Sequence, residues 1–203
     1  MNTAAVGFQC PGCVTEGRNS VRQIKIKKPI VTQTIIGICV AVFGLEMVSG
    51  TDFAYNFGIA GAAIDPGGEY FRFITSMFLH ADVIHIAFNM LILWQIGTAL
   101  EMTLGSPRFA LLYLVSGLGG GLASITLNNP YTLSVGASGA IFGLLGAYVV
   151  YARYMRVNTS QVLVLIGINL VLGFVLPGID WHAHLGGLVV GAAIAGIMTS
   201  MKA

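Results

Sequence analysis

The chain is constrained most by a series of long apolar runs that carry almost no charge. Six runs are each close to the about 20 helical residues that cross a ~30 Å hydrocarbon core, at roughly 32–49, 83–100, 109–127, 137–152, 160–177 and 183–201. The last five contain no Asp, Glu, Lys or Arg, and the first contains only Glu46. The runs lack the period-2 alternation of membrane β-barrels. The sequence therefore predicts an all-α integral membrane protein with six transmembrane helices.

The composition excludes a soluble protein. Only 9% of the residues are charged, against about 25% in soluble domains. With 56% apolar residues and a mean hydropathy of +0.83, the chain has too little charge to cover a water-facing surface. A net charge of +2 is also too small to indicate nucleic-acid binding. We therefore expect a lipid bilayer around the chain and no nucleic acid as a partner.

Basic residues gather at one set of span ends, and this predicts the orientation of the chain. Only Arg72 lies at the opposite set of ends. The positive-inside rule then places both termini in the cytoplasm, in a multi-pass protein of the plasma or inner membrane. The nine basic residues on the cytoplasmic side are Arg18, Arg22, Lys25, Lys27, Lys28, Arg108, Arg153, Arg156 and Lys202.

Two long segments lie outside the predicted spans. Residues 1–28 are expected to form a flexible cytoplasmic tail, with one CxxC motif at Cys10 and Cys13. A structural zinc site needs four ligands and this tail offers two, so we expect no metal and no cofactor. The outer loop between spans one and two, from about 49 to 82, has turn signals at Gly61 and Pro66. Apolar clusters around Phe73 predict short helices in the membrane interface within this loop.

Four polar side chains enter the membrane from the outer face. His85 and Asn89 are four residues apart and share one face of span two, while Ser138 begins span four and His184 begins span six. Ser138 precedes Arg153 by about 22 Å of helix, and His184 precedes the end of span six by about 27 Å. Both therefore lie near one level below the outer face. Because polar groups at membrane depth are costly and are usually functional, we expect one shared site.

The residue types predict the chemistry of this site. A serine hydroxyl becomes a nucleophile when a base takes its proton, and a neutral imidazole does so near pH 7. Spans two to six contain no Asp or Glu to orient the imidazole, so the sequence predicts a dyad, with Ser138 as nucleophile and His184 as general base. The backbone N–H of Ser138, the Asn89 amide and a His85 ring N–H are the expected donors of an oxyanion hole.

Small residues on spans four and six explain how these helices would approach closely enough for Ser138 and His184 to form a hydrogen bond. Gly139 and Gly143 form one GxxxG face on span four, and Gly187 and Gly191 form another on span six. Phe142 follows Ser138 by one helical turn and is expected to pack against the imidazole. These glycine faces are accounted for by packing within the chain, so they do not indicate an oligomer.

The same residues carry a resemblance to a known family. The chain resembles the rhomboid family of intramembrane serine proteases from about residue 32 to 202. The resemblance implies a bacterial six-helix core, a protease domain at 29–203, and cleavage of transmembrane substrates near the outer face. It rests on GASGAIFG at 136–143, which includes Gly136, HADVIHIAFN at 80–89, AHLGGLVVG at 183–191, Tyr70-Phe71-Arg72 in the outer loop, and Gly97 and Glu101 at the end of span two.

Each residue also has an ordinary structural explanation. Ser138 alone would be a small packing residue, and Asn89 alone an interhelical hydrogen bond. Ser124 is interpreted in that way, His182 is assigned no role, and His80 is expected at most to support the outer loop. The alternative function is a non-catalytic rhomboid-like protein that binds membrane clients. Such proteins typically lack the serine or the histidine, and this sequence retains both.

Overall fold

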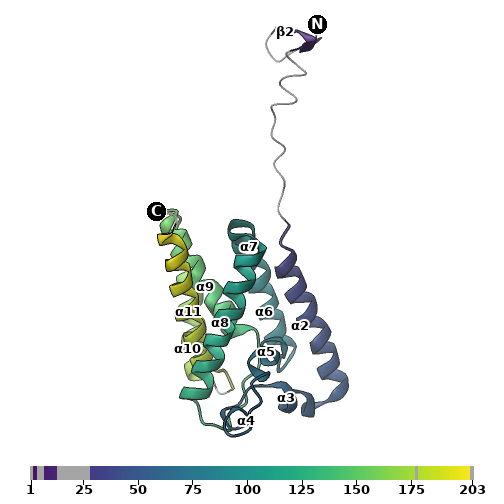
Figure 1. The fold of residues 1–203 in the computed structure, drawn as a ribbon, viewed down its shortest axis with the longest axis vertical. Coiled ribbons are helices and arrows are strands. Elements are labelled where there is room, and N and C mark those ends of the chain that lie inside the picture. Colours follow the sequence, from purple (N-terminus) through teal and green to yellow (C-terminus); the bar gives the residue numbers. More distant parts are fainter. Residues whose placement is uncertain (1, 4–6, 13–27, 177, 202–203) are drawn as a thin grey trace.

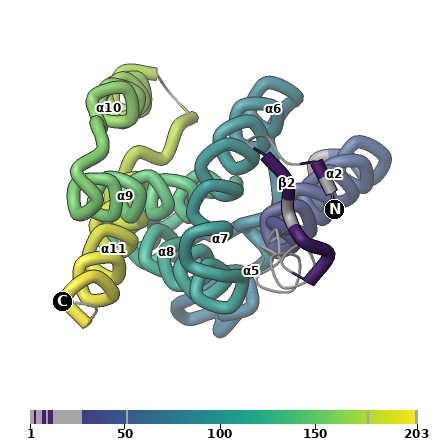
Figure 2. The backbone as a smooth tube through the Cα atoms, turned by 90° about the horizontal axis from the view of Figure 1, so that it is seen from above, coloured from purple at the N-terminus to yellow at the C-terminus, as the bar shows by residue number. Residues whose placement is uncertain are grey.

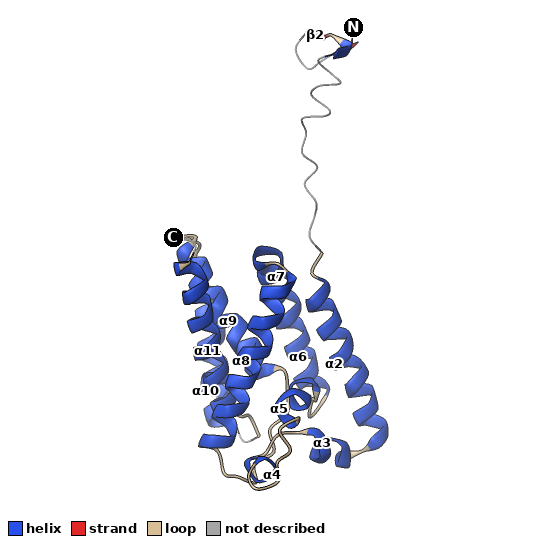
Figure 3. Ribbon diagram, viewed as in Figure 1, coloured by secondary structure: helices blue, strands red, loops and turns tan. Residues whose placement is uncertain are grey.

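The computed structural model describes residues 2–3, 7–12, 28–176 and 178–201 (Figure 1). In this part of the chain the structure is helical, apart from one antiparallel pair of two-residue strands, β1 (Asn2–Thr3) and β2 (Phe8–Gln9) (Figure 3). Helices packed side by side form the body of the molecule. The predicted all-α membrane fold is therefore confirmed.

Six helical segments match the six predicted spans. Four are long and apolar enough to cross a membrane by themselves: α2 (Ile30–Ser49), Val83–Leu104, α8 (Ser106–Leu127) and α11 (Trp181–Ser200). The two shorter ones are α9 (Ser138–Tyr154) and α10 (Ser160–Val175). The second span is continuous but not uniform, because a π-helical stretch, η2 (Leu93–Gly97), lies between α6 (Val83–Ile92) and α7 (Thr98–Leu104).

Helix α9 lies inside the bundle rather than at its lipid-facing edge. Every residue from Gly139 to Ala147 is buried, and α8 and α11 pack against this helix. Seen from above, α10 and α2 lie at opposite edges (Figure 2). The 17 residues of α9 span about 25 Å, which is less than the ~30 Å of a hydrocarbon core. The N-terminus of α9 is therefore recessed below the outer end of the bundle.

The outer loop contains short helices, as predicted from its apolar clusters. They are α3 (Thr51–Phe57), α4 (Gly61–Ile64), α5 (Arg72–Thr75) and the 3₁₀ helix η1 (Ser76–Phe78). Figure 1 places α3 and α4 at the end of the bundle opposite the two termini. Two backbone hydrogen bonds between Ile59 and Ser134, of 3.0 and 2.8 Å, join this loop to the segment that leads into α9. The loop is thus attached directly to the start of the central helix.

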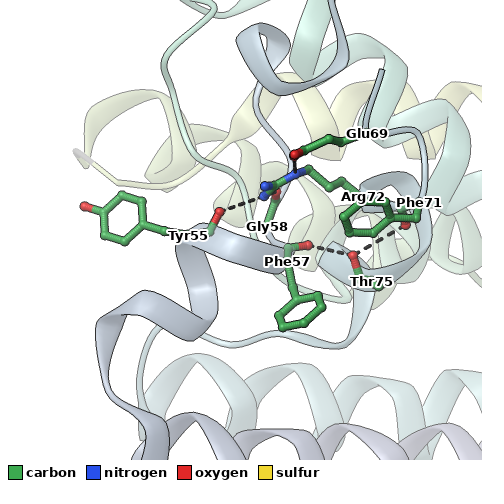
Figure 4. Close-up of polar contacts among 7 residues, drawn as sticks. All are labelled: Tyr55, Phe57, Gly58, Glu69, Phe71, Arg72 and Thr75. Carbon is green, nitrogen blue, oxygen red and sulfur yellow. Dashed lines mark hydrogen bonds and ion pairs between the residues drawn. The ribbon is translucent and has the colours of Figure 1, made fainter. Parts of the chain in front are cut away.

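A buried guanidinium holds the outer loop together. Arg72 is 8% exposed, and its Nη1 donates to the backbone carbonyls of Tyr55 and Gly58, each at 2.7 Å (Figure 4). The same side chain forms an ion pair with Glu69, and the nearby Thr75 hydroxyl donates to the Phe57 carbonyl at 2.7 Å. Hydrogen bonds from a charged donor are stronger than neutral ones. Arg72 therefore fixes the end of α3 against α5.

A buried carboxylate holds the start of α2 at the end of the bundle that carries the two termini. Glu101 is 1% exposed and accepts the backbone N–H groups of Val31 at 3.0 Å and Thr32 at 2.8 Å. It also accepts the hydroxyls of Thr32 at 2.8 Å and Ser106 at 2.6 Å. Pro29, at the N-cap of α2, supplies no side-chain cap. Because the first N–H groups of a helix lack intrahelical partners, Glu101 caps α2 from the second span.

Replacing Glu101 tests this cap. Glu101→Ala leaves the buried N–H of Thr32 and the half-buried N–H of Val31 without an acceptor, so the free energy of unfolding should fall by about 2 kcal/mol or more. Thermal unfolding in detergent micelles measures the change. The control is Thr103→Ala, an exposed position on α7 whose hydroxyl bonds within its own helix, and this variant should unfold like the wild type. Equal loss in both variants would contradict the cap.

Candidate active site

Two side chains from different helices form a hydrogen-bonded pair at the recessed end of α9. Ser138 is the first residue of α9, and His184 is in the first turn of α11. The His184 Nε2 lies 2.9 Å from the Ser138 Oγ, and the imidazole is buried. The two residues are 46 positions apart in the chain, so their contact depends on how the helices pack.

Glycines bring the two helices into backbone contact. A Cβ atom built on Gly187 would overlap the carbonyl oxygen of Gly139, and one built on Gly191 would overlap the carbonyl oxygen of Gly143. Any side chain at these positions would push α11 away from α9. The close approach places the first turn of α11 directly beside the first turn of α9.

The imidazole of His184 is oriented by an aromatic ring. Phe142 stacks on it with ring centroids 4.2 Å apart and planes 6° from parallel. The second ring nitrogen, Nδ1, is buried and has no hydrogen-bond partner among the described residues. Among the described residues, therefore, no carboxylate holds this histidine and no third polar side chain extends the pair.

His85 and Asn89 line the same end of the bundle from α6. The His85 Nδ1 lies 3.3 Å from the backbone nitrogen of Ala81, which donates to it. Because Nδ1 is an acceptor, the neutral His85 ring carries its proton on Nε2. The Asn89 amide donates one N–H to the His85 carbonyl at 2.8 Å and keeps its second N–H. Asp82 caps α6 by accepting the His85 N–H at 2.8 Å.

Gly136 sets the distance between His85 and the serine. Its φ of +129° disfavours any residue with a side chain. A Cβ there would lie 2.8 Å from the His85 Nε2 and 3.6 Å from the Ser138 Oγ. The His85 Nε2 and the Ser138 oxygen thus both lie close to the point that a side chain at Gly136 would occupy. A cavity next to this space is lined by Ser76, Met77, Gly117, Ser138, Gly139 and Ala183.

His80 lies behind His85, in the loop before α6. It is 2% exposed, its ring centroid is 5.2 Å from that of His85, and its backbone N–H donates to Glu46 at 3.0 Å. Neither ring nitrogen has a partner among the described residues. Burial and the neighbouring His85 ring lower the pKa of His80 from 6.5 to about 4. The ring is therefore neutral at physiological pH.

Apart from an interhelical hydrogen bond of Ser124, the sequence did not predict the polar cluster at the start of α11. Asp180 contacts Ser124 of α8 and Asn128, the C-cap residue of that helix. His182, for which the sequence predicts no role, contacts Asn128 at 2.6 Å. The available signals were the helical spacing of Ser124 and Asn128 and the position of Asp180 directly before an apolar run. The partners are more than 50 residues apart in the chain, so the pairing itself had no signal.

Some predicted features lie outside the described residues. They include Cys13, Lys202 and most of the basic residues before span one. Cys10 is described and exposed. The flexible tail and the absence of a zinc site both remain predictions.

Known proteins resemble this chain over most of its length. The model of the Rhomboid domain matches residues 67–201. The chain is a member of the rhomboid family. The rhomboid protease GluP of Bacillus subtilis is 38% identical over 185 residues, which is 87% of this chain and 36% of that protein. The rhomboid-type serine protease 2 of Emericella nidulans is 36% identical over 132 residues, covering 62% and 26%.

A second Bacillus subtilis rhomboid, YdcA, is 32% identical over 153 residues, covering 73% of this chain and 74% of that protein. The chain thus spans about a third of the length of GluP and about three quarters of YdcA. The rhomboid domain that the family model matches in this chain includes both Ser138 and His184.

The glycine contact in this rhomboid can be tested with two alanine variants on one helix. Gly187→Ala should lower the free energy of unfolding by roughly 1–3 kcal/mol, because the added methyl overlaps the α9 backbone. Gly196→Ala is the control, since an added methyl there would have nothing within 4 Å, and it should be at least as stable as the wild type. Thermal unfolding in detergent compares them. Equal stability of the two variants would contradict the contact.

The buried His80 predicts acid-sensitive stability. The unfolded chain protonates this ring near pH 6.5 and the folded chain only near pH 4, so the free energy of unfolding falls as pH decreases through that interval. The loss attributable to His80 should be about 3 kcal/mol at pH 4. Unfolding of the wild type and His80→Phe should be measured from pH 7 to pH 4. The variant should lose less stability, and an identical loss would count against the prediction.

Proposed function

We propose that this rhomboid is an intramembrane serine endopeptidase, in which Ser138 is the nucleophile and His184 the general base. The observation that carries the proposal is the 2.9 Å contact between the Ser138 Oγ and the His184 Nε2. The names of GluP and of the Emericella relative, which describe proteases, support it. In the first step, the Ser138 oxygen attacks a peptide carbonyl carbon while its proton passes to His184.

The second half of the reaction uses the same two residues. Collapse of the tetrahedral intermediate breaks the C–N bond, and His184 returns the proton to the leaving amine. The acyl group then remains on the Ser138 oxygen as an ester. A water molecule, deprotonated by His184, attacks this ester and releases the acid with regeneration of the serine. The reaction consumes one water per bond cleaved and needs no cofactor.

The negative charge that develops on the carbonyl oxygen would be stabilised by three donors. The tautomer of His85 directs its Nε2–H toward the space beside Gly136, and Asn89 has a second amide N–H to donate. The backbone N–H of Ser138 is at the start of a helix of 17 residues and therefore has no intrahelical acceptor. Charge in a buried site is stabilised strongly by such fixed donors.

The site would face the outer side of the membrane. In Figure 1 the start of α2 and the end of α11 lie at the same end of the molecule. The loop with α3 and α4 lies at the opposite end. Lys28 precedes α2, Arg108 is in the first turn of α8, and Arg153 is in the last turn of α9, all at the end that carries the termini. This asymmetry supports cytoplasmic termini in the plasma or inner membrane.

Substrates would be other transmembrane proteins with a locally unwound segment. A continuous helix keeps its carbonyls in backbone hydrogen bonds, because unpaired polar groups are costly in lipid. The recessed start of α9 supports this proposal, because a substrate segment would reach Ser138 from the membrane and water would reach it from outside.

Point variants in liposomes test the proposal. The purified wild type should cleave a single-span reporter protein, while Ser138→Ala and His184→Ala should lose at least about 10³-fold in kcat. Ser200→Ala is the control, because its exposed hydroxyl bonds within α11, and it should keep full activity.

A fluorophosphonate probe distinguishes the remaining outcomes. Labelling of the wild type but not of Ser138→Ala would establish an activated serine even without a cleaved reporter. Cleavage by Ser138→Ala would overturn the nucleophile. Neither cleavage nor labelling by the wild type would favour the non-catalytic client-binding alternative.

A further inference from the structure

The first turn of α11 is held by a carboxylate that the proposed reaction does not use. Asp180 is the N-cap of α11, and its Oδ1 accepts the backbone N–H of Ala183 at 3.0 Å. Its backbone carbonyl accepts the N–H of His184 at 3.3 Å. Asp180 thus bonds directly to the backbone of the residue that contacts Ser138. An N-cap of this type defines where a helix begins.

The same carboxylate is bound to the end of α8. The Ser124 hydroxyl donates to the Asp180 Oδ2 at 2.5 Å, and the Asn128 amide donates to the Oδ1 at 2.9 Å. Burial alone would raise the pKa of Asp180, but the hydrogen bonds from Ser124, Asn128 and Ala183 outweigh it and keep the pKa below its usual value. The side chain is therefore an ionised acceptor that joins two helices.

His182 extends this cluster from α11. The His182 Nδ1 lies 2.6 Å from the Asn128 Oδ1. Asn128 thus donates its amide N–H to Asp180 while its oxygen contacts His182. The Trp181 ring covers the His182 ring, with centroids 3.8 Å apart. Asp180 and His182, at the start of α11, are thus both bound to Asn128, the C-cap residue of α8.

These bonds supply a constraint that the glycine contact lacks. The contact between Gly187 and Gly139 sets how near α11 lies to α9, but it contains no polar side chain that fixes rotation or sliding along the helix axis. A second hydrogen bond does not hold the His184 ring in place, because its Nδ1 has no partner among the described residues. The direction of its Nε2 therefore follows from where the α11 backbone begins.

We propose that Asp180 is a positioning residue: bound by Ser124 and Asn128, it fixes the depth and rotation of the first turn of α11 and so directs His184 toward Ser138. The inference rests on the proposed function for its kinetic consequence. Asp180 is not a third catalytic member, since the bonds of its carboxylate go to Ser124, Asn128 and Ala183 rather than to the imidazole.

Kinetics of three variants provide the first test. Asp180→Ala should lower kcat by roughly 10- to 100-fold, as a displacement of about 1 Å does, and change KM less than about threefold. Asp180→Asn keeps an oxygen for the Ala183 N–H, so it should recover part of the lost kcat. The matched control is Asp52→Ala, an exposed carboxylate in the first turn of α3, which should retain the wild-type kcat.

A spectroscopic readout tests the same inference without turnover. The chain has four histidines, so the ¹⁵N resonances of His184 can be assigned by comparison with His184→Ala. In the wild type the Nε2 resonance should change when Ser138→Ala removes its partner. Asp180→Ala should shift this resonance in the folded protein, and Asp52→Ala should leave it unchanged.

The two readouts separate failure of the inference from failure of the proposed function. A shifted His184 resonance in Asp180→Ala supports positioning even if the wild type cleaves no reporter, which would count only against the protease. An unshifted resonance in folded Asp180→Ala overturns the inference, whatever the activity. Unchanged kcat in Asp180→Ala, in an active wild type, overturns it as well. A lower unfolding temperature with an unchanged kcat would mean that Asp180 only stabilises the fold.

Discussion

The contact between the backbones of α9 and α11 is the constraint on which the candidate site depends. Two glycines on each helix remove the side chains that would separate them, and a methyl group at Gly187 would already overlap the Gly139 carbonyl. In lipid the burial of apolar surface does not drive helices together, because the lipid tails are themselves apolar. Helix association depends instead on close van der Waals contact between small residues. The same contact places an imidazole 2.9 Å from a serine hydroxyl at the recessed end of the central helix. Packing and proposed chemistry thus use the same residues.

Three buried or half-buried charges stabilise the ends of the bundle around this contact. Arg72 joins parts of the outer loop, Glu101 caps α2, and Asp180 caps α11 while it binds α8. Each is surrounded by hydrogen-bond partners, as a buried charge requires if its desolvation is to be offset. Each also lies at a helix end or in a loop, where backbone groups need partners. The apolar middle of the bundle is held by packing, while Glu101 and Asp180 fix where α2 and α11 begin.

The sequence predicts well what depends on local pattern and poorly what depends on pairing. The spans follow from apolar runs of helical length, and the predicted bounds of α2 and α8 differ from the observed ones by at most three residues. Ser138 and His184 can be predicted as site residues because polar groups at membrane depth are costly and usually functional. The π-helical stretch at 93–97 could not be predicted, because its residues look like any apolar helix. The Asp180 cluster was missed because its residues come from the ends of two helices that only the fold brings together.

Among the described residues His184 has no carboxylate partner, and this agrees with the environment of the site. An aspartate beside the imidazole would need two or three hydrogen-bond donors of its own to offset its desolvation, and the described residues leave His184 Nδ1 without any partner. Stacking on Phe142 restricts the imidazole plane without adding a charge. The carboxylate that the region does contain, Asp180, lies one turn away at the helix end, where Ser124, Asn128 and a backbone N–H solvate it. A charge at that position can fix the backbone that carries the histidine without placing a carboxylate beside the imidazole.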